Sequence, residues 1–279
     1  MKNRRSFIVG VKSVSLSNNE KLFLKKYKPW GVILFSRNIK TIFQTKKLTD
    51  DIKKIFKDRN YPILIDQEGG RVNRLRKFLN TDKLTSEFFG NLYKKDKKKF
   101  KTYYSIFVNK TSYILKLIGA NINTVPVLDL RIDGSSKIIG NRSFSKDPKL
   151  VSKIGNECIK DFQKHKIGTV IKHIPGHGHS KVDSHKKTPI VKIEYDKLIK
   201  NDFFSFKKKK SLLAMTAHII YQNIDPVNTA THSKKIIDLI RNKIGFSQIL
   251  MTDDISMKSL KGSVTENTLK AFKAGCNIV

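Results

Sequence analysis

The sequence predicts an α/β protein built as a single (β/α)8, or TIM, barrel. Short apolar runs alternate with helix-like segments about eight times along the chain, which is the pattern of a closed parallel barrel. The length of 279 residues is close to the roughly 250 of a typical barrel. No internal repeat or flexible linker is evident, so we expect one domain over residues 1–279. Polar residues also gather where several of the apolar runs end.

The expected strands are continuously apolar or β-branched, as parallel strands covered on both faces usually are. They are residues 7–11, 31–35, 62–66, 121–128, 168–173, 212–216, 248–252 and 276–279. The last run begins only four residues before the end of the sequence. We therefore expect a barrel that is short at its C-terminal end, because a barrel strand is normally followed by a covering helix. Such a barrel would expose apolar surface and be weakened.

Helix signals lie between these runs. Ser17 and Glu20 form a capping-box pattern, and Pro29 ends the helix that follows. Ser233 is placed to cap a later helix that stops at Gly245. A doubly wound open sheet is the alternative, but the sequence contains neither a G-x-G-x-x-G motif nor a P-loop.

The composition is strongly basic. Lys and Arg number 57 against 23 Asp and Glu, a net charge of +34. Because these charges are spread along the whole chain, we interpret them as a solvated surface, and binding of nucleic acid is not expected. A nucleic-acid-binding protein on an inactive barrel stays open as the alternative.

The location and partners are also predicted. No apolar run approaches the roughly 20 residues of a membrane span, and the run 7–11 is shorter than the ~7 residues of a secretory signal. We therefore expect a cytoplasmic protein with no membrane partner, and a monomer. Cys158 and Cys276 are far apart in sequence and suggest neither a disulfide framework nor a zinc site.

Polar residues at five strand ends predict a site on one rim of the barrel, because the chemistry of such barrels lies at the carboxyl ends of the strands. The segments are 66–74, 129–144, 172–185, 216–218 and 252–254.

Side chains of neighbouring strand residues point to opposite faces. Asp253 and Asp254 therefore cannot act as a pair, and we expect one to face the pocket and the other to face a helix or cap. His218 and His232 have no partner in the pattern and fit structural histidines.

A cluster of histidines raises the alternative of a zinc site. His173, His177, His179 and His185 fall within thirteen residues. His173 and His177 have the spacing of a helical zinc motif, but Pro175 and a glycine intervene and the glutamate of H-E-x-x-H is absent. We therefore expect no metal and no other cofactor.

The motifs in chain order resemble those of glycoside hydrolase family 3, in particular the bacterial β-N-acetylglucosaminidases of cell-wall recycling. They are Gly31-Val-Ile-Leu-Phe, Ile65-Asp-Gln-Glu-Gly-Gly-Arg-Val, Asn123-Thr-Val-Pro-Val-Leu-Asp, Gly140-Asn-Arg-Ser-Phe, Lys172-His-Ile-Pro-Gly-His-Gly, Asp183-Ser-His, Ala214-Met-Thr-Ala-His and Thr252-Asp-Asp-Ile-Ser-Met. The resemblance spans nearly the whole chain, and the Lys-His-x-Pro-Gly-His-Gly stretch with its following Asp-Ser-His is specific.

The resemblance implies a role for each matching residue. Asp253 matches the nucleophile, His185 the general acid/base and Asp183 its partner. The residues that match those holding the terminal N-acetylglucosamine ring are Asp66, Arg74, Arg142, Lys172 and His173. The implied enzyme is an exo-acting, retaining β-N-acetylhexosaminidase that acts on N-acetylglucosamine-containing muropeptide fragments.

Some positions depart from the family pattern, and one reaction alternative stays open. His179 and Ser180 stand where many relatives have Asp and Thr, and Asn277 replaces a common Asp. A substrate-assisted mechanism is disfavoured, because Asp253 and Asp254 cannot lie side by side. A phosphorylase would use the same residues, since a neutral histidine base does not repel phosphate.

Overall fold

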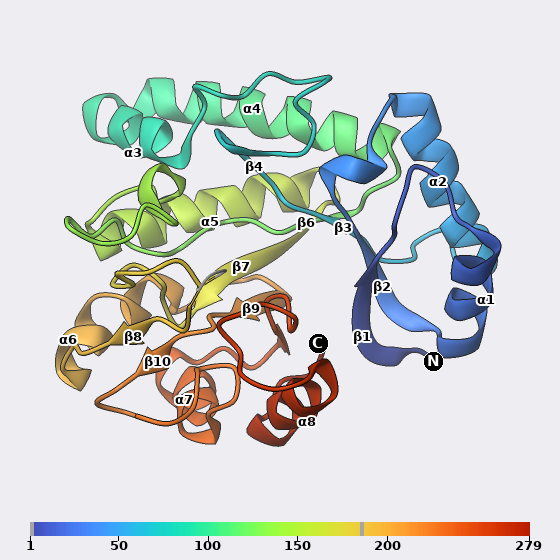
Figure 1. Cartoon of the computed structure of the whole chain (residues 1–279). Coiled ribbons are helices and arrows are strands. Elements are labelled where there is room, and N and C mark those ends of the chain that lie inside the picture. Colours follow the sequence, from blue (N-terminus) through green and yellow to red (C-terminus); the bar gives the residue numbers. More distant parts are fainter. Residues whose placement is uncertain (1–2, 185–186) are drawn as a thin grey trace.

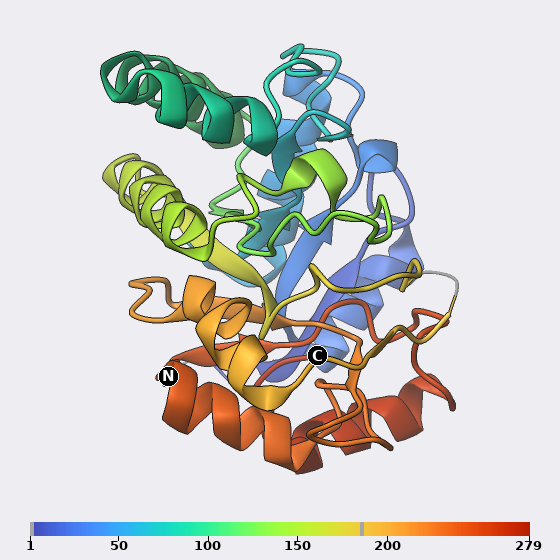
Figure 2. The same ribbon diagram turned by 90° about the vertical axis from the view of Figure 1, so that its left-hand side faces the viewer.

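The computed structural model describes residues 3–184 and 187–279. Its centre is a parallel sheet in the order β1-β2-β3-β6-β7-β9-β11, and helices lie around the outside of the curled sheet (Figures 1 and 2). The seven strands are β1 (Arg5–Gly10), β2 (Pro29–Leu34), β3 (Ile63–Ile65), β6 (Ile122–Asn123), β7 (Gly168–Ile174), β9 (Leu213–Thr216) and β11 (Ile249–Met251). The expected parallel α/β fold is confirmed.

Two apolar clusters cover the two faces of this sheet. The larger one packs the strands against the surrounding helices. The smaller one draws one or two side chains from every strand of the large sheet, for example Ile8, Leu64 and Val170, and includes Ile278. The strands are therefore buried on both faces, which is why their sequences are continuously apolar.

Residues 276–279 lie between β11 and β1. Ile278 forms a parallel bridge with Met251, and Thr252 N donates to Ile278 O at 3.0 Å. On the other side, Ile8 N donates to Val279 O at 2.8 Å and Val279 N donates to Ser6 O at 3.1 Å. The segment forms this isolated bridge rather than a regular strand, and it hydrogen-bonds with both edges of the seven-stranded sheet.

The helices are α1 (Asn18–Tyr27), α2 (Ile42–Ile55), α3 (Ser86–Lys95), α4 (Lys97–Leu117), α5 (Pro148–Lys164), α6 (Tyr195–Lys200), α7 (Lys234–Leu239) and α8 (Val264–Ala274). Short helical turns add η1 (Ser36–Asn38), η2 (Gly140–Arg142), η3 (Phe203–Phe206) and the π-helical η4 (Ile240–Ile244). Among the described residues, no helix combines the length and apolar character that crossing a membrane requires.

The helix boundaries follow the sequence signals. Ser17 and Glu20 form the expected capping box of α1. The side chain of Ser233 accepts from Ile236 N at the start of α7, and Gly245 takes the left-handed conformation after η4. These local predictions are confirmed.

Other local predictions were wrong or incomplete. The run 121–128 is a regular strand only over Ile122–Asn123. Its later part still bonds to β7, through a parallel bridge between Val127 and Lys172 and through Leu128 N, which donates to Lys172 O at 2.7 Å. Two small strand pairs were missed. They are β4 (Gln67–Gly69) with β5 (Val72–Asn73), and β8 (Ile190–Val191) with β10 (Ile220–Tyr221). The strands of both pairs have only two or three residues, which is too short for an alternating or continuously apolar pattern, and Gln67–Gly69 is also polar.

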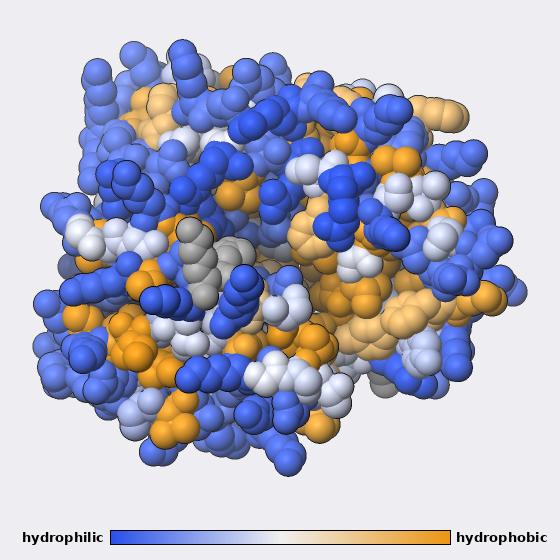
Figure 3. Space-filling model, viewed as in Figure 1, coloured by the Kyte–Doolittle hydropathy of each residue, from blue (hydrophilic) through white to orange (hydrophobic). Residues whose placement is uncertain are grey.

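Hydrophilic side chains cover most of the face shown in Figure 3, with apolar residues in patches between them. This agrees with the interpretation of the basic residues as a solvated surface.

Candidate active site

A cavity of about 190 Å³ opens at the carboxyl ends of the strands. It is lined by Asp66, Glu68, Arg71, Val72, Arg74, Ile138, Ile139, Arg142, Lys172, His173, His177, Ser184, Met215 and Asp253. A second hollow of about 510 Å³ shares Asp66, Arg74, Met215 and Asp253 with it and continues toward β1 and β2. Six of the eight residues expected at the site therefore line one cavity: Asp66, Arg74, Arg142, Lys172, His173 and Asp253.

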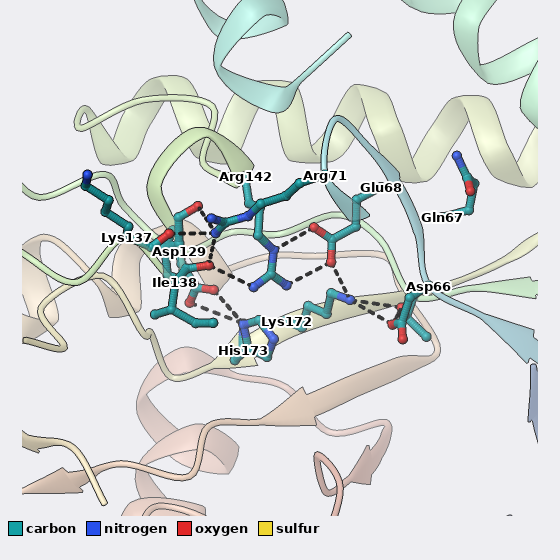
Figure 4. Close-up of polar contacts among 12 residues, drawn as sticks. Asp66, Gln67, Glu68, Arg71, Asp129, Lys137, Ile138, Arg142, Lys172 and His173 are labelled. Atoms are coloured by element: carbon teal, nitrogen blue, oxygen red, sulfur yellow. Dashed lines mark hydrogen bonds and ion pairs between the residues drawn. The ribbon is translucent and has the colours of Figure 1, made fainter. Parts of the chain in front are cut away.

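A network of buried and partly buried charges forms one wall (Figure 4). Lys172, at the end of β7, places Nζ 3.0 Å from Asp66 Oδ1 and 2.7 Å from Glu68 Oε1. Arg142, from η2, donates two bonds of 2.8 Å to the Glu68 carboxylate. Arg74 lies 3.4 Å from Asp66 through Nη2. Each carboxylate thus bridges two cations, so the network holds its side chains in fixed positions.

The charged groups of this network stay ionised. Burial alone would raise the pKa of Asp66 and Glu68, but the adjacent cations outweigh it and lower both. For Glu68 the pKa falls from 4.5 to about 2 because of Arg142 and Lys172. Burial would lower the pKa of Lys172, but Asp66 and Glu68 outweigh it and raise it. All three groups are therefore ionised at neutral pH.

Asp129 organises the two histidines of the Lys-His-x-Pro-Gly-His-Gly stretch. It is fully buried, lies 2.7 Å from His173 Nδ1 through Oδ2, and accepts from His177 N at 2.6 Å. The Asp129 pKa is lowered, because interactions with His173 and His177 outweigh burial. The ionised carboxylate can only accept, so Nδ1 of His173 donates to it and Nε2 is left for the cavity.

Asp253 follows β11 and lines both hollows. Its Oδ1 accepts from Asp254 N at 2.8 Å. Burial acts to raise the Asp253 pKa, but interactions with His173, His218 and the Asp254 N–H outweigh it and lower it. Asp254 is exposed, and its Oδ1 accepts from Ser256 N at 2.9 Å. Asp254 also lines the second hollow but not the cavity of about 190 Å³, so the two carboxylates differ in their surroundings, and the role of Asp253 stays a prediction.

The segment that carries the expected acid/base pair reaches the cavity at Ser184. Ser184 lines the cavity, and its Oγ lies 3.2 Å from His177 Nε2. Asp183, one residue earlier, is close enough to Arg71 for their charges to interact. His185 itself lies outside the described residues, so its place in the site stays a prediction.

The positions that depart from the family pattern have partners of their own. His179 Nε2 lies 3.2 Å from Asp202 Oδ2, and Ser180 O accepts from Ser136 N at 2.8 Å. Asn277 Oδ1 accepts from Leu250 N at 2.8 Å and from Arg241 Nη2 at 2.8 Å. The amide oxygen of Asn277 can therefore hold this edge of the sheet as a carboxylate would.

Across residues 3–184 and 187–279, no three His, Cys, Asp or Glu side chains are grouped so that they could hold a metal ion. In the cavity wall, Asp66 and Glu68 instead face lysine or arginine, and Asp129 faces His173.

Comparison with known proteins identifies the family. Residues 8–279 match the glycosyl hydrolase family 3 N-terminal domain. The chain belongs to glycosyl hydrolase family 3. The beta-hexosaminidase of Nitrosomonas eutropha is 31% identical over 284 residues, covering 98% of this chain and 79% of the relative.

Similar solved structures agree with this assignment. NagZ from Neisseria gonorrhoeae, in complex with N-trifluoroacetyl-D-glucosamine, has a TM-score of 0.90 at 30% identity, over 99% of this chain and 80% of that one. A family 3 β-N-acetylglucosaminidase from a Paenibacillus species has a TM-score of 0.89 at 26% identity, over 98% of this chain and 52% of that one.

Several residues that build the site were not given a role from the sequence. Glu68 and Asp129 lie inside quoted motifs, and Thr124 donates to Asp66 and accepts from Lys172. The sequence signal that could have identified these residues is their place near the carboxyl ends of strands, close to residues already predicted for the site. His218, interpreted as structural, contacts the turn that carries Asp253 through Asp254 O.

Proposed function

We propose that this family 3 chain is a β-N-acetylhexosaminidase that removes terminal N-acetylglucosamine with retention of configuration. The observation that carries the proposal is the position of Asp253, whose lowered pKa keeps it ionised, in a cavity of about 190 Å³. The other wall of this cavity presents hydrogen-bond donors and acceptors suited to sugar hydroxyls. The comparisons support the proposal, because relatives are named beta-hexosaminidase and a similar structure holds N-trifluoroacetyl-D-glucosamine.

In the proposed reaction, Asp253 attacks the anomeric carbon and forms a glycosyl-enzyme, which water then hydrolyses. The lowered pKa of Asp253 keeps the attacking oxygen deprotonated. The hydrogen bond from Asp254 N to Oδ1 fixes one carboxylate oxygen and leaves Oδ2 for the attack.

His185 is proposed to donate the proton to the leaving oxygen and then to remove a proton from water. An imidazole has an ordinary pKa of about 6.5, and a neighbouring carboxylate raises it, so both protonation states are available near neutral pH. Asp183 is proposed as that carboxylate, with the additional role of orienting the ring.

Recognition of the terminal sugar is assigned to the charged wall. Asp66 is an acceptor for sugar hydroxyls, while Arg74, Arg142 and Lys172 are donors. His173 presents Nε2 because Asp129 holds Nδ1. We assign the terminal sugar ring to the cavity of about 190 Å³ and the rest of the substrate to the second hollow of about 510 Å³, an arrangement that fits exo-action.

The finer features of the fold and the cell biology are also proposals. The hydrogen bonds of residues 276–279 with both β11 and β1 support a closed eight-stranded (β/α)8 barrel formed by one domain, residues 1–279. A role on muropeptide fragments in cell-wall recycling, a cytoplasmic location and a monomeric state stay predictions.

The test is product analysis with a terminal β-N-acetylglucosaminide, with and without phosphate, for the native chain and two matched variants. We expect free β-N-acetylglucosamine in both buffers, and a slow fluorinated substrate should label Asp253. Asp253→Asn should lose turnover, whereas the neighbouring Asp254→Asn keeps it, because the amide oxygen can still cap the turn.

Three outcomes would contradict the proposal. A sugar phosphate as the main product would make the enzyme a phosphorylase. A label on Asp254 or Asp66 would remove Asp253 as the nucleophile. Absence of turnover together with tight, salt-dependent DNA binding would favour the nucleic-acid alternative.

A further inference from the structure

The His218 ring lies beneath the nucleophile turn and is 1% exposed. It follows β9 by two residues. Its Nε2 is 3.0 Å from the carbonyl oxygen of Asp254, and its Nδ1 is 2.7 Å from Thr231 Oγ1. Both ring nitrogens therefore have hydrogen-bond partners, and the partner of Nε2 belongs to Asp254, the residue next to Asp253.

The direction of these bonds follows from their chemistry. A carbonyl oxygen only accepts, so Nε2 carries the hydrogen. Burial lowers the pKa of His218, so the ring is neutral at neutral pH and Nδ1 must accept from the Thr231 hydroxyl. Thr231 Oγ1 in turn lies 2.8 Å from Thr216 Oγ1, which can donate to it. The chain of donors runs from Thr216 through Thr231 and His218 to the Asp254 carbonyl.

The peptide units of Asp254 connect this chain to the proposed nucleophile. Asp254 N–H donates to Asp253 Oδ1 at 2.8 Å, while Asp254 C=O accepts from His218. A rotation of this turn would therefore have to break the His218 bond before it could move the donor that fixes Asp253. We infer that His218 is a positioning residue that fixes the Asp253–Asp254 turn and, through it, the attacking carboxylate; this rests on the proposed function of Asp253.

His232 provides a contrast on the same stretch of chain. It is partly buried, and its Nε2 lies 3.1 Å from Asn267 O in α8. That bond also joins a histidine to a backbone carbonyl, but it holds a helix that carries none of the proposed site residues. His232 is therefore a control for the loss of a hydrogen bond between a histidine and a backbone carbonyl as such.

Two substitutions separate the bond from the packing. In His218→Gln the amide nitrogen can take the place of Nε2 and donate to Asp254 O. In His218→Asn the shorter amide reaches only the place of Nδ1, so the bond to Asp254 is lost. Thr231→Val is a third variant of nearly unchanged shape that removes only the hydroxyl that donates to Nδ1.

The measurements are kcat, KM and the pH dependence of kcat/KM on a nitrophenyl and an unactivated N-acetylglucosaminide. We expect His218→Asn to lower the rate of glycosylation by about 100-fold, the effect of a misplacement of about 1 Å, with KM little changed. The loss should be the same for both leaving groups, because the nucleophile and not the proton donor is displaced. The acid limb should move to higher pH, because Asp253 loses both the interaction with His218 and the fixed Asp254 N–H, which lower its pKa.

The controls decide between positioning and packing. His218→Gln should recover most of the rate but only part of the acid-limb shift, because its amide restores the bond to Asp254 O and not the interaction of the imidazole with Asp253. Thr231→Val should show a smaller loss of rate, and His232→Asn should lower the melting temperature without changing the rate or the acid limb. The inference is overturned if His218→Asn or Thr231→Val keeps the native rate and acid limb, or if His218→Gln is as slow as His218→Asn. A failure of the native enzyme to be labelled at Asp253 would instead overturn the proposed function, and the inference with it.

Discussion

Glu68 offers a quantitative test of the charged wall, through the substitution Glu68→Gln. The side chain is 3% exposed and makes three contacts with cations, two with Arg142 at 2.8 Å and one with Lys172 at 2.7 Å. Glutamine keeps one acceptor oxygen but turns an N–H₂ group toward a donor. Removing one partner of a buried ion pair costs about 3–5 kcal/mol. Because Asp66 still holds Lys172 at 3.0 Å, we expect the lower end, about 3 kcal/mol.

The pH dependence of this loss has a definite sign. The Glu68 pKa is depressed from 4.5 to about 2, since Arg142 and Lys172 outweigh the effect of burial. A depressed carboxyl pKa contributes stability that is fully present above pH 4.5 and is lost as the pH falls toward 2. The difference between the native protein and Glu68→Gln should therefore shrink by about 1–1.5 kcal/mol between pH 7 and pH 3.5.

The assay is urea unfolding of both proteins at pH 7 and pH 3.5, with Glu87→Gln as the control. Glu87 makes the same type of pair, with Arg131, but the two side chains are 34% and 44% exposed. That substitution should cost less than about 1 kcal/mol. An equal loss in the two variants at pH 7, or a Glu68→Gln difference that does not shrink in acid, would refute the reasoning.

Two further predictions concern the histidines. His185→Ala should lose about 10²–10⁴-fold in glycosylation on an unactivated disaccharide and far less on a nitrophenyl glycoside; equal losses in pre-steady-state rates would argue against an acid/base role. Asp129→Asn should weaken the orientation of His173 and raise the inhibition constant of N-acetylglucosamine by about 10–100-fold, as expected for one charge-assisted hydrogen bond; an unchanged constant would show that His173 needs no anionic partner.

Much of the fold could be predicted because its signals are local. The apolar runs of β2, β3 and β11 and the caps at Ser17 and Ser233 depend on neighbouring residues alone. The hairpin of β4 and β5 could not, because Gln67–Gly69 is polar and contains a glycine, and it is held by pairing rather than by its own propensity.

The partners within the site depend on contacts that no local pattern encodes. Glu68 and Arg142 are separated by 74 positions, and His218 and Asp254 by 36. Strand alternation did predict that Asp253 and Asp254 would diverge. It could not predict that the peptide N–H of Asp254 would bond to the Asp253 carboxylate, because that depends on the turn that follows the strand.

The net charge of +34 is likewise a poor guide to the chemistry of the cavity. The anionic groups in or directly behind its wall are Asp66, Glu68, Asp129 and Asp253, and the cationic ones are Arg71, Arg74, Arg142 and Lys172. Among the described residues these two sets balance. A site that attracted a polyanion would instead need an excess of cations facing the ligand. Since most of these cations already pair with carboxylates, the wall offers directed hydrogen bonds and little net field, which suits an uncharged sugar ring.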